Sequence, residues 1–409
     1  MKSRVIIGFL CMLSGITFSQ QFLPIQHDSA STHNELIVSG NVELSSTSIQ
    51  NQLVKKLIYG GEITNDQINT SLSKHLSMNR LGLDLNSEIE FRNFKSTIFK
   101  KSNWGYLLKA GYYTIGGANY SKDLFGLVFN GNQNYLGGTA VFSGTSFAFT
   151  TFQKIGFGII DKKSKSSISL NYINASDYQN AMVKEGTMDL TADGTLVKLN
   201  SKGGYRSSQG TNIFKGIGVG VDIDYRFMII RNGIKNSTFQ FLAKNLGFVN
   251  YFAGLRTYQM DTSLVYDGFK LNQLYGNQSI FNDSVSLLDS LHIQQSVEKK
   301  LIFLPGFLQF GKILNDNYGL KWDYFYGIRL YPTLAYTPML YVGVQWKPTS
   351  KVDVGAQASV GGFSRFRMGV YSNFNLSNWA IGIGSQDIIG MISNKGYGQS
   401  LLIRLRCKL

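Results

Sequence analysis

Polar and apolar residues alternate at the end of the chain. The last eleven residues read "QSLLIRLRCKL". Extended backbone would place two sets on opposite sides of a strand, the apolar Ile403, Leu405, Cys407 and Leu409 and the cations Arg404, Arg406 and Lys408. A helix would scatter both sets around its surface. The pattern therefore predicts a strand with one face toward hydrocarbon and the other toward water.

The same alternation recurs in four other segments, at 80–92, 217–227, 352–360 and 365–374. Each puts aliphatic or aromatic residues on one side, as a transmembrane barrel strand does toward lipid. The charged residues on the opposite, inward sides are Asp84, Glu88, Glu90, Arg92, Asp222, Asp224, Arg226, Asp353, Arg365 and Arg367. Together with Arg404, Arg406 and Lys408 they predict a charged network that faces the lumen.

Extending this reading to β-branched and aromatic runs gives fourteen strands. They lie near 36–44, 80–98, 104–114, 139–160, 166–174, 217–229, 236–246, 302–312, 322–330, 339–347, 351–360, 364–375, 378–386 and 398–409. The number is even, and several lengths match the roughly nine to eleven residues that a tilted strand needs to cross a bilayer. The fold class predicted is an all-β, antiparallel transmembrane barrel with helical loop insertions.

The connections between these strands are sorted by length. Short turns alternate with long connections near 45–79, 115–138, 175–216 and 247–301, which are interpreted as external insertions. Bacterial barrels have short periplasmic turns and longer external loops. The resulting organisation is a periplasmic N-terminal segment at 20–35 and a barrel at 36–409, with both termini in the periplasm.

The insertions predict structure of their own. Residues 47–76 fit two short amphipathic helices separated at Gly60 and Gly61, and residues 279–300 fit another helix. Residues 185–201 fit a projecting hairpin that turns at Asp193 and Gly194.

Several ordered segments resemble a known family. They are "LGLDLN" at 81–86, "SKDLFGLVFNGNQNYLGGTAVFSG" at 121–144, "GIGVGVDIDYRF" at 216–227, "KNLGFVNY" at 244–251 and "LPGFLQFGK" at 304–312. The chain resembles Bacteroidota outer-membrane barrels grouped as a family of unknown function, distant relatives of the long-chain fatty acid transporter and of PorV, the barrel of the type 9 secretion system. The resemblance implies an outer-membrane barrel and carries over no catalytic or binding residue. The match is loose at 257–300.

Composition agrees with a β-rich exported protein. The chain has 5 Pro, 44 Gly, 28 Phe and 22 Tyr, and only 16% of its residues are charged. Lys2 and Arg4 precede the apolar stretch "VIIGFLCMLSGITF", which predicts a signal peptide over residues 1–19, cut ahead of Gln20. Cys407 would then be the only cysteine of the mature chain, so no internal disulfide is expected.

The charge balance bears on partners. The net charge is +15, and two of these charges lie in the predicted signal peptide. An exported chain of this kind favours phosphate-bearing lipid headgroups or internal ion pairing over nucleic acid as the reason for its basic residues. Outer-membrane lipid is therefore an expected partner, and nucleic acid is not.

The sequence gives only weak evidence for a catalytic or metal site. The histidines, His27, His33, His75 and His292, fall in predicted termini or loops, without a second histidine or a cysteine at ligand spacing. The glycines of "GIGVGVD" alternate within a strand, which argues against a dinucleotide loop. Residues 282–289, "NDSVSLLD", lack the spacing and central Gly of a calcium loop. We expect no enzyme activity and no cofactor.

The inward charges have two interpretations. As a conducting pore, the cations would line an anion-selective lumen. As a structural network, they would pair with the inward acids, because unpaired charges in a poorly hydrated lumen are costly. Barrel closure would bring Arg404, Arg406 and Lys408 within one strand of Glu88 and Glu90, and this favours the paired, partly filled lumen.

Three classes of function follow. The first is an accessory or scaffold subunit of an outer-membrane machine for protein assembly or secretion, with other barrels or lipoproteins as partners. The second is a transporter or channel for hydrophobic or small polar compounds. The third is a surface adhesin or receptor.

Overall fold

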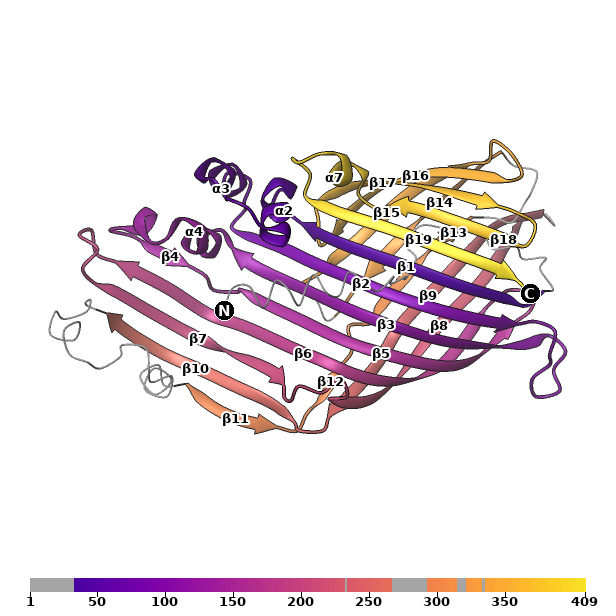
Figure 1. Cartoon of the computed structure of the whole chain (residues 1–409), viewed down its shortest axis with the longest axis horizontal. Helices are drawn as coiled ribbons and strands as arrows, with labels where there is room; N and C mark the ends of the chain where they lie inside the picture. Colours follow the sequence, from indigo (N-terminus) through magenta and orange to yellow (C-terminus); the bar gives the residue numbers. More distant parts are fainter. Residues whose placement is uncertain (1–32, 232–233, 267–292, 315–320, 333–334) are drawn as a thin grey trace.

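The computed structural model describes residues 33–231, 234–266, 293–314, 321–332 and 335–409. They form a closed, antiparallel β-barrel of fourteen strands (Figure 1). In order around the wall these are β1 (Glu35–Ser46), β2 (Met78–Asn93), β3 (Trp104–Ser121), β5 (Ser146–Asp161), β6 (Ser167–Leu190), β8 (Gly216–Arg231), β9 (Ile234–Tyr251), β13 (Phe307–Ile313), β14 (Trp322–Leu330), β15 (Thr337–Trp346), β16 (Val352–Gly362), β17 (Phe366–Asn375), β18 (Trp379–Ser385) and β19 (Gly398–Lys408). Pairing of β19 with β1 closes the ring.

The predicted strands and their number are confirmed, with several changes of boundary. The strands predicted at 104–114 and 236–246 continue to Ser121 of β3 and Tyr251 of β9, and the strand predicted at 302–312 is divided into β12 (Leu301–Phe303) and β13. The segment predicted as one strand at 139–160 is divided into β4 (Thr139–Val141) and β5, because a turn with Gly144 at a φ of +77° separates them. Strand β2 ends at Asn93, five residues before the predicted end. Strand β6 continues to Leu190, far beyond the predicted residue 174.

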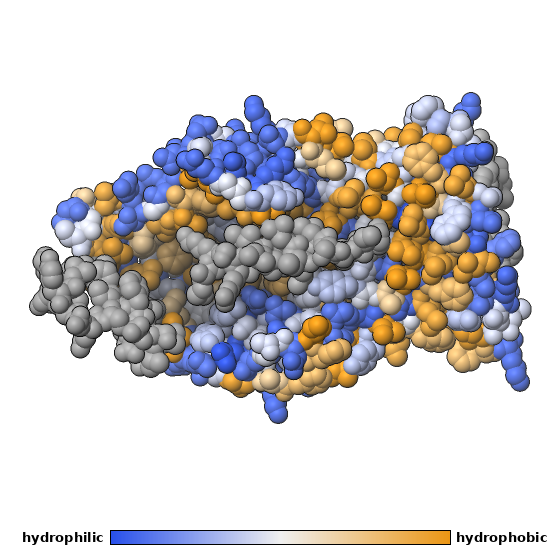
Figure 2. Space-filling model, in the orientation of Figure 1, coloured by the Kyte–Doolittle hydropathy of each residue, from blue (hydrophilic) through white to orange (hydrophobic). Residues whose placement is uncertain are grey.

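The outer wall of the barrel is apolar, as the alternation predicts. On β2, Ile89 is exposed while the flanking Glu88 and Glu90 are buried, and the same alternation holds along β8, β16 and β17. Figure 2 shows hydrophobic residues gathered over the barrel, toward the right of the view, and hydrophilic residues over the helices and along the right-hand edge. That edge is the end of the barrel with the short turns, where the C-terminus also lies (Figure 1).

Part of the sheet projects beyond the barrel at the opposite end (Figure 1). This platform consists of β4, residues 179–190 of β6, β7 (Val197–Ser208), β10 (Leu255–Tyr266) and β11 (Gln294–Glu298). The hairpin predicted at 185–201 is its β6–β7 turn, and Gly194 has a φ of +71° there. The helix predicted over 279–300 is wrong at 294–298, where β11 pairs with β10; residues 279–292 lie outside the described residues.

Helices cover the same end of the barrel (Figure 1). The two helices predicted within 47–76 are α2 (Asn51–Tyr59) and α3 (Asn65–Leu72), and Thr64 and Gln67 form a capping box at the start of α3. With α4 (Lys122–Asn130) they enclose a small core of Ile49, Leu53, Val54, Ile68 and Phe125. No helix in the described residues is long and apolar enough to cross a membrane.

Strand β18 is shorter than its two neighbours and covers only part of each. Within the described residues, β18 pairs with residues 370–375 of β17 and 402–407 of β19, so residues 366–369 of β17 and 398–401 of β19 have no strand partner on the side facing β18. The short helix α7 (Ile388–Ile392) packs against both β17 and β19 at this place. Asn51 of α2 secures the segment by donating to the carbonyl oxygens of Gly390 at 2.6 Å and Gly398 at 2.9 Å.

Candidate functional site in the barrel lumen

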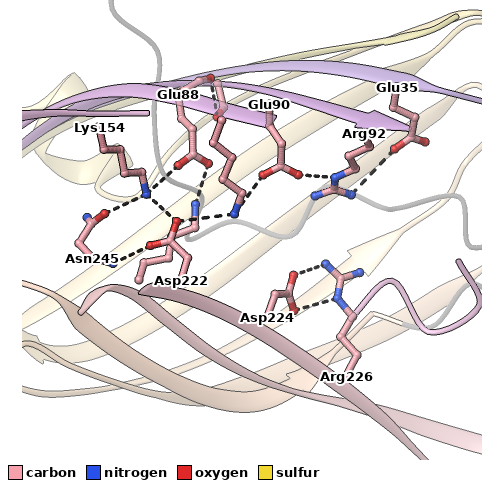
Figure 3. Close-up of polar contacts among 12 residues, drawn as sticks. Glu35, Glu88, Glu90, Arg92, Lys154, Asp222, Asp224, Arg226 and Asn245 are labelled. Carbon is pink, nitrogen blue, oxygen red and sulfur yellow. Dashed lines mark hydrogen bonds and ion pairs between the residues drawn. The ribbon is translucent and has the colours of Figure 1, made fainter. Parts of the chain in front are cut away.

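Buried charges gather in the lumen and form what we call the ion cluster: Glu88 and Glu90 of β2, Lys109 of β3, Lys154 of β5, Asp222 of β8 and Lys244 of β9. These side chains point inward because each lies on the face of its strand that is turned toward the lumen. Figure 3 shows several of them converging from neighbouring parts of the wall. The cluster contains three acids and three lysines, so its formal charges balance.

Short contacts hold the ion cluster together. Lys154 Nζ lies 2.6 Å from Asp222 Oδ2 and 3.3 Å from Glu88 Oε2. Lys109 Nζ lies 3.4 Å from Glu90 Oε2 and 3.6 Å from Asp222 Oδ2. The hydroxyl of Tyr113 donates to Glu88 at 2.6 Å. Such multiple contacts are needed to offset the cost of removing several charges from water.

The ion cluster crosses the lumen. Lys244 Nζ lies 2.9 Å from Glu88 Oε1, although β3, β5, β6 and β8 separate their strands. Asn245, next to Lys244, accepts from Lys154 at 2.9 Å through its side chain and donates its backbone N–H to Asp222 at 2.8 Å. The contacts therefore connect one side of the barrel to another and reduce the free cross-section.

An aromatic plug fills the lumen nearer the helices. Its members are Phe307, Tyr331, Tyr336 and Phe363. Tyr331 donates to Asp84 Oδ2 at 3.0 Å, and the strand that ends before Tyr331, β14, stands opposite β2 in the ring. A Cβ placed on Gly82 of β2 would lie 1.9 Å from Cγ of Phe363, so glycine is required for the ring to seat against that wall.

Further buried contacts join inward side chains along the rest of the wall. Arg367 of β17 forms an ion pair with Glu43 of β1, and Lys312 of β13 lies 3.0 Å from Asp323 of β14. Arg329 donates to Gln309 at 2.7 Å. A barrel of fourteen strands is wider than the eight-stranded barrels that side chains alone fill easily, and here long polar and aromatic side chains reach inward from most of the wall.

The structure places the predicted lumen residues in separate groups. Glu88, Glu90 and Asp222 belong to the ion cluster, and Arg92 extends it by contacting Glu90 and, at 3.9 Å, Glu35. Asp224 and Arg226 form a pair beside it (Figure 3). Asp84 and Arg367 lie nearer the aromatic plug.

The C-terminal cations have the predicted position and largely different partners. Strand β1 lies between β19 and β2, and Ile37 pairs with both Arg406 and Glu90 while Ser39 pairs with both Arg404 and Glu88. Arg406 nevertheless lies 4.0 Å from Glu35, whereas lysines of β3, β5 and β9 contact Glu88 and Glu90. Arg404 is buried, and Lys408 is half-buried at the short-turn end.

Two predicted residues lie apart from these groups. Asp353 is buried on β16 and accepts from Asn375 at 2.9 Å. Arg365 is a correction, because it lies in the turn before β17, is exposed, and donates to the carbonyl oxygen of Lys74 at 3.1 Å. The alternation does not extend to Arg365 because the turn between β16 and β17 ends the extended backbone at this point.

The lumen side chains pair their charges with one another and narrow the channel through the barrel. No group of three or more His, Cys, Asp or Glu side chains in the described residues could hold a metal ion. Each carboxylate of the ion cluster lies within 4.0 Å of a lysine and is thereby neutralised.

Residues 31–385 match the profile of a family described as a family of unknown function, DUF5723. The chain belongs to DUF5723. No curated protein matches this DUF5723 member.

Several solved barrels are similar to the DUF5723 chain at low identity. The Pseudomonas putida toluene transporter TodX is 9% identical, with 92% of this chain and 89% of that chain covered and a TM-score of 0.36. The translocator domain of the autotransporter NalP from Neisseria meningitidis is 8% identical, with 93% and 90% covered and a TM-score of 0.30. The transport unit of the Escherichia coli autotransporter AIDA-I is 8% identical, with 95% and 93% covered and a TM-score of 0.27. These likenesses are too distant to bear on function.

Proposed function

We propose that this DUF5723 member is a non-enzymatic, integral outer-membrane barrel that serves as an accessory or scaffold subunit of a complex for protein assembly or secretion. The apolar outer wall supports residence in a bilayer, and the pairing of neighbouring strands around the closed barrel satisfies most backbone hydrogen bonds of the wall without water. The predicted signal peptide and the sorting of short and long connections support the outer membrane, with both termini in the periplasm.

One observation carries the scaffold role. Contacts cross the lumen at two levels, at Lys244–Glu88 and at Tyr331–Asp84. A passive pore needs a continuous water-filled path, and these contacts together with the aromatic plug oppose one. The structured surface lies instead outside the barrel, in the platform and the helices, where a protein partner could bind.

The platform gives the scaffold role a test. In a shortened variant, residues 188–199 are replaced by Asn-Gly, which joins the register partners Thr187 and Asn200 and leaves the barrel strands intact. We expect the full chain, extracted gently from native membranes, to coelute with a stoichiometric barrel or lipoprotein, and the shortened variant to lose it. A lone full-length chain, or a large steady conductance in planar bilayers, would contradict the scaffold role.

A second candidate is a transporter for hydrophobic or small polar compounds, and one observation favours it. An apolar groove of about 640 Å³ lies on the outer wall beside α7, lined by residues that include Val344, Ala356, Val370, Ile383 and Met391. It adjoins the ends of β17 and β19 that have no strand partner on the side facing β18. The variant Asn51→Ala would release α7 from its hydrogen bonds. Faster uptake of an apolar dye by this variant than by Gln52→Ala would support transport; equal uptake would exclude this route.

A further inference from the structure

All four tryptophans of the chain lie at one end of the barrel. Trp104, Trp322 and Trp379 begin strands, Trp346 ends one, and each of these strand ends faces the short turns. Trp322, Trp346 and Trp379 are 60%, 41% and 52% exposed. Exposed tryptophan rings prefer the boundary between hydrocarbon and headgroups. This tryptophan girdle therefore marks a depth in the bilayer.

Lysines lie just beyond the girdle. Four short turns are described in full, at 94–103, 162–166, 347–351 and 376–378, and within them there are eight lysines and no acidic residue. Lys321 immediately precedes Trp322, Lys347 immediately follows Trp346, and Lys101 precedes Trp104 by three residues. The positive side chains thus begin one to three residues outside the tryptophan rings.

Five of the eight turn lysines are exposed, and together with the exposed Lys321 they define the basic collar: Lys95, Lys100, Lys101, Lys163, Lys321 and Lys351. Among the described residues, none of the six lies within 4.0 Å of an Asp or Glu carboxylate, and Lys95 donates to the main-chain oxygen of Leu409 at 3.5 Å. Lys165 is not part of the collar, because it is buried with its ammonium 3.7 Å from the ring centre of Phe94. Hydrophilic residues along the right-hand edge of Figure 2 mark this rim.

The opposite end of the molecule differs in its charges. Acids and bases are mixed there, with Glu62, Asp66, Asp123, Asp189 and Asp193 close in sequence to Lys55, Lys56, Lys74, Lys122 and Lys184. The excess of one sign is therefore specific to the short-turn end. If these lysines served only to keep the protein soluble, the two ends of the molecule would not need to differ in the sign of their exposed charges.

We propose that the basic collar binds the phosphate groups of anionic phospholipids in the leaflet at the short-turn end. The inference rests on the proposed membrane residence. Lysines beside an anionic leaflet are attracted to it over about a Debye length, and here the girdle places them at headgroup depth. An acidic soluble protein is the less favoured occupant, because the lysines lie on separate turns around the rim beside exposed tryptophans and not on one protruding surface.

The test compares two variants that remove equal charge. The collar variant carries Lys100→Gln, Lys101→Gln, Lys163→Gln and Lys351→Gln, and the control carries Lys74→Gln, Lys122→Gln, Lys184→Gln and Lys198→Gln at the other end. Each protein is purified from membranes and placed in nanodiscs of phosphatidylethanolamine with a minor fraction of phosphatidylglycerol. Native mass spectrometry then counts the phosphatidylglycerol molecules that stay bound.

We expect wild type and control to retain phosphatidylglycerol preferentially, and the collar variant to lose about ten-fold in that preference. High salt should reduce the preference of the wild type. Equal retention by both variants would overturn the proposal, as would loss of an acidic soluble partner from the collar variant with lipid retention unchanged. A wild-type chain that enters no nanodisc of any composition would contradict membrane residence itself.

Discussion

Lys244 and Glu88 form a 2.9 Å ion pair between strands β9 and β2, which lie on different sides of the barrel. Both side chains are largely buried, with exposures of 14% and 6%. Backbone hydrogen bonds connect only neighbouring strands of the wall. This ion pair adds a side-chain connection between two strands that are not neighbours.

Lys244→Met should destabilise the barrel. Removing one partner from a buried pair costs about 3–5 kcal/mol where the other charge is left uncompensated. Lys154 at 3.3 Å and the Tyr113 hydroxyl at 2.6 Å still contact Glu88, so we expect a loss below that range. The measurement is the free energy of unfolding in detergent by urea titration. Lys202→Met is the matched control, because its pair with Asp261 at 2.9 Å is 51% and 74% exposed and should contribute little to stability. Equal losses for both variants would show that the pair across the lumen has no special weight.

Gly82→Ala should displace Phe363 from the aromatic plug. The added methyl group would overlap the ring, and relief by moving buried side chains costs about 1–3 kcal/mol. Gly138→Ala is the control, since nothing lies closer than 3.6 Å to its added methyl group. Unfolding midpoints of the two variants and single-channel recordings would be compared with wild type. A Gly82→Ala protein of unchanged stability would show that Phe363 does not seat on this wall.

Tyr331→Phe should weaken the plug while keeping its shape. The change removes the hydroxyl that donates to Asp84 at 3.0 Å and leaves that buried carboxylate with one partner fewer, at a cost of about 1–3 kcal/mol. Tyr59→Phe, at a side chain that is 66% exposed, should change stability little. Both free energies of unfolding can be measured by the same titration. A neutral Tyr331→Phe would mean that Asp84 is satisfied without it.

The helices should loosen in acid because of His75. Burial lowers the pKa of this imidazole, and Lys122 and Arg365 add to the effect, while the ring packs 4.2 Å from Phe125. The unfolded state titrates near the ordinary value of about 6.5 and binds the proton more readily. Stability is therefore present above that pH and is lost as the pH falls below it.

Hydrogen exchange of α3 and α4 at pH 7.5 and pH 5.5 tests this dependence. We expect lower protection at the acidic pH in the wild type and a smaller difference in His75→Phe, which keeps an aromatic ring without a titrating group. The same loss of protection in both proteins would assign the acid effect to another residue.

The barrel could be predicted from the sequence because its signal is local. Alternation along β8 or β16 depends only on which neighbours face lipid, and the short and long connections then give strand direction. Of the platform, the projecting hairpin at 185–201 could be predicted. The continuous sheet that joins it to the barrel could not, because both faces of β6 are partly exposed there and the alternation weakens beyond Ala175.

The acids of the ion cluster could also be predicted, whereas their lysines could not. Lys109 lies two residues after the buried Leu107, and Lys154 lies two residues after the buried Phe152, so each lysine shares the inward face of its strand with an apolar residue. The inner faces of β3 and β5 are therefore partly apolar. Alternation no longer separates the two faces there. The pair Lys244–Glu88 depends further on which strands face each other across a closed ring, and no local pattern contains that information.

Strand β6 has a mechanical consequence. Its 24 residues span about 80 Å as extended backbone, whereas the hydrocarbon core of a bilayer is about 30 Å thick. One strand therefore serves as both barrel wall and platform, and β5 accompanies it across the junction, with a bulge at Ser176 and a second bulge at Lys184 where β6 pairs with β7. The direction in which the platform projects is therefore set by the tilt of β6 in the barrel wall together with the bend that these bulges introduce.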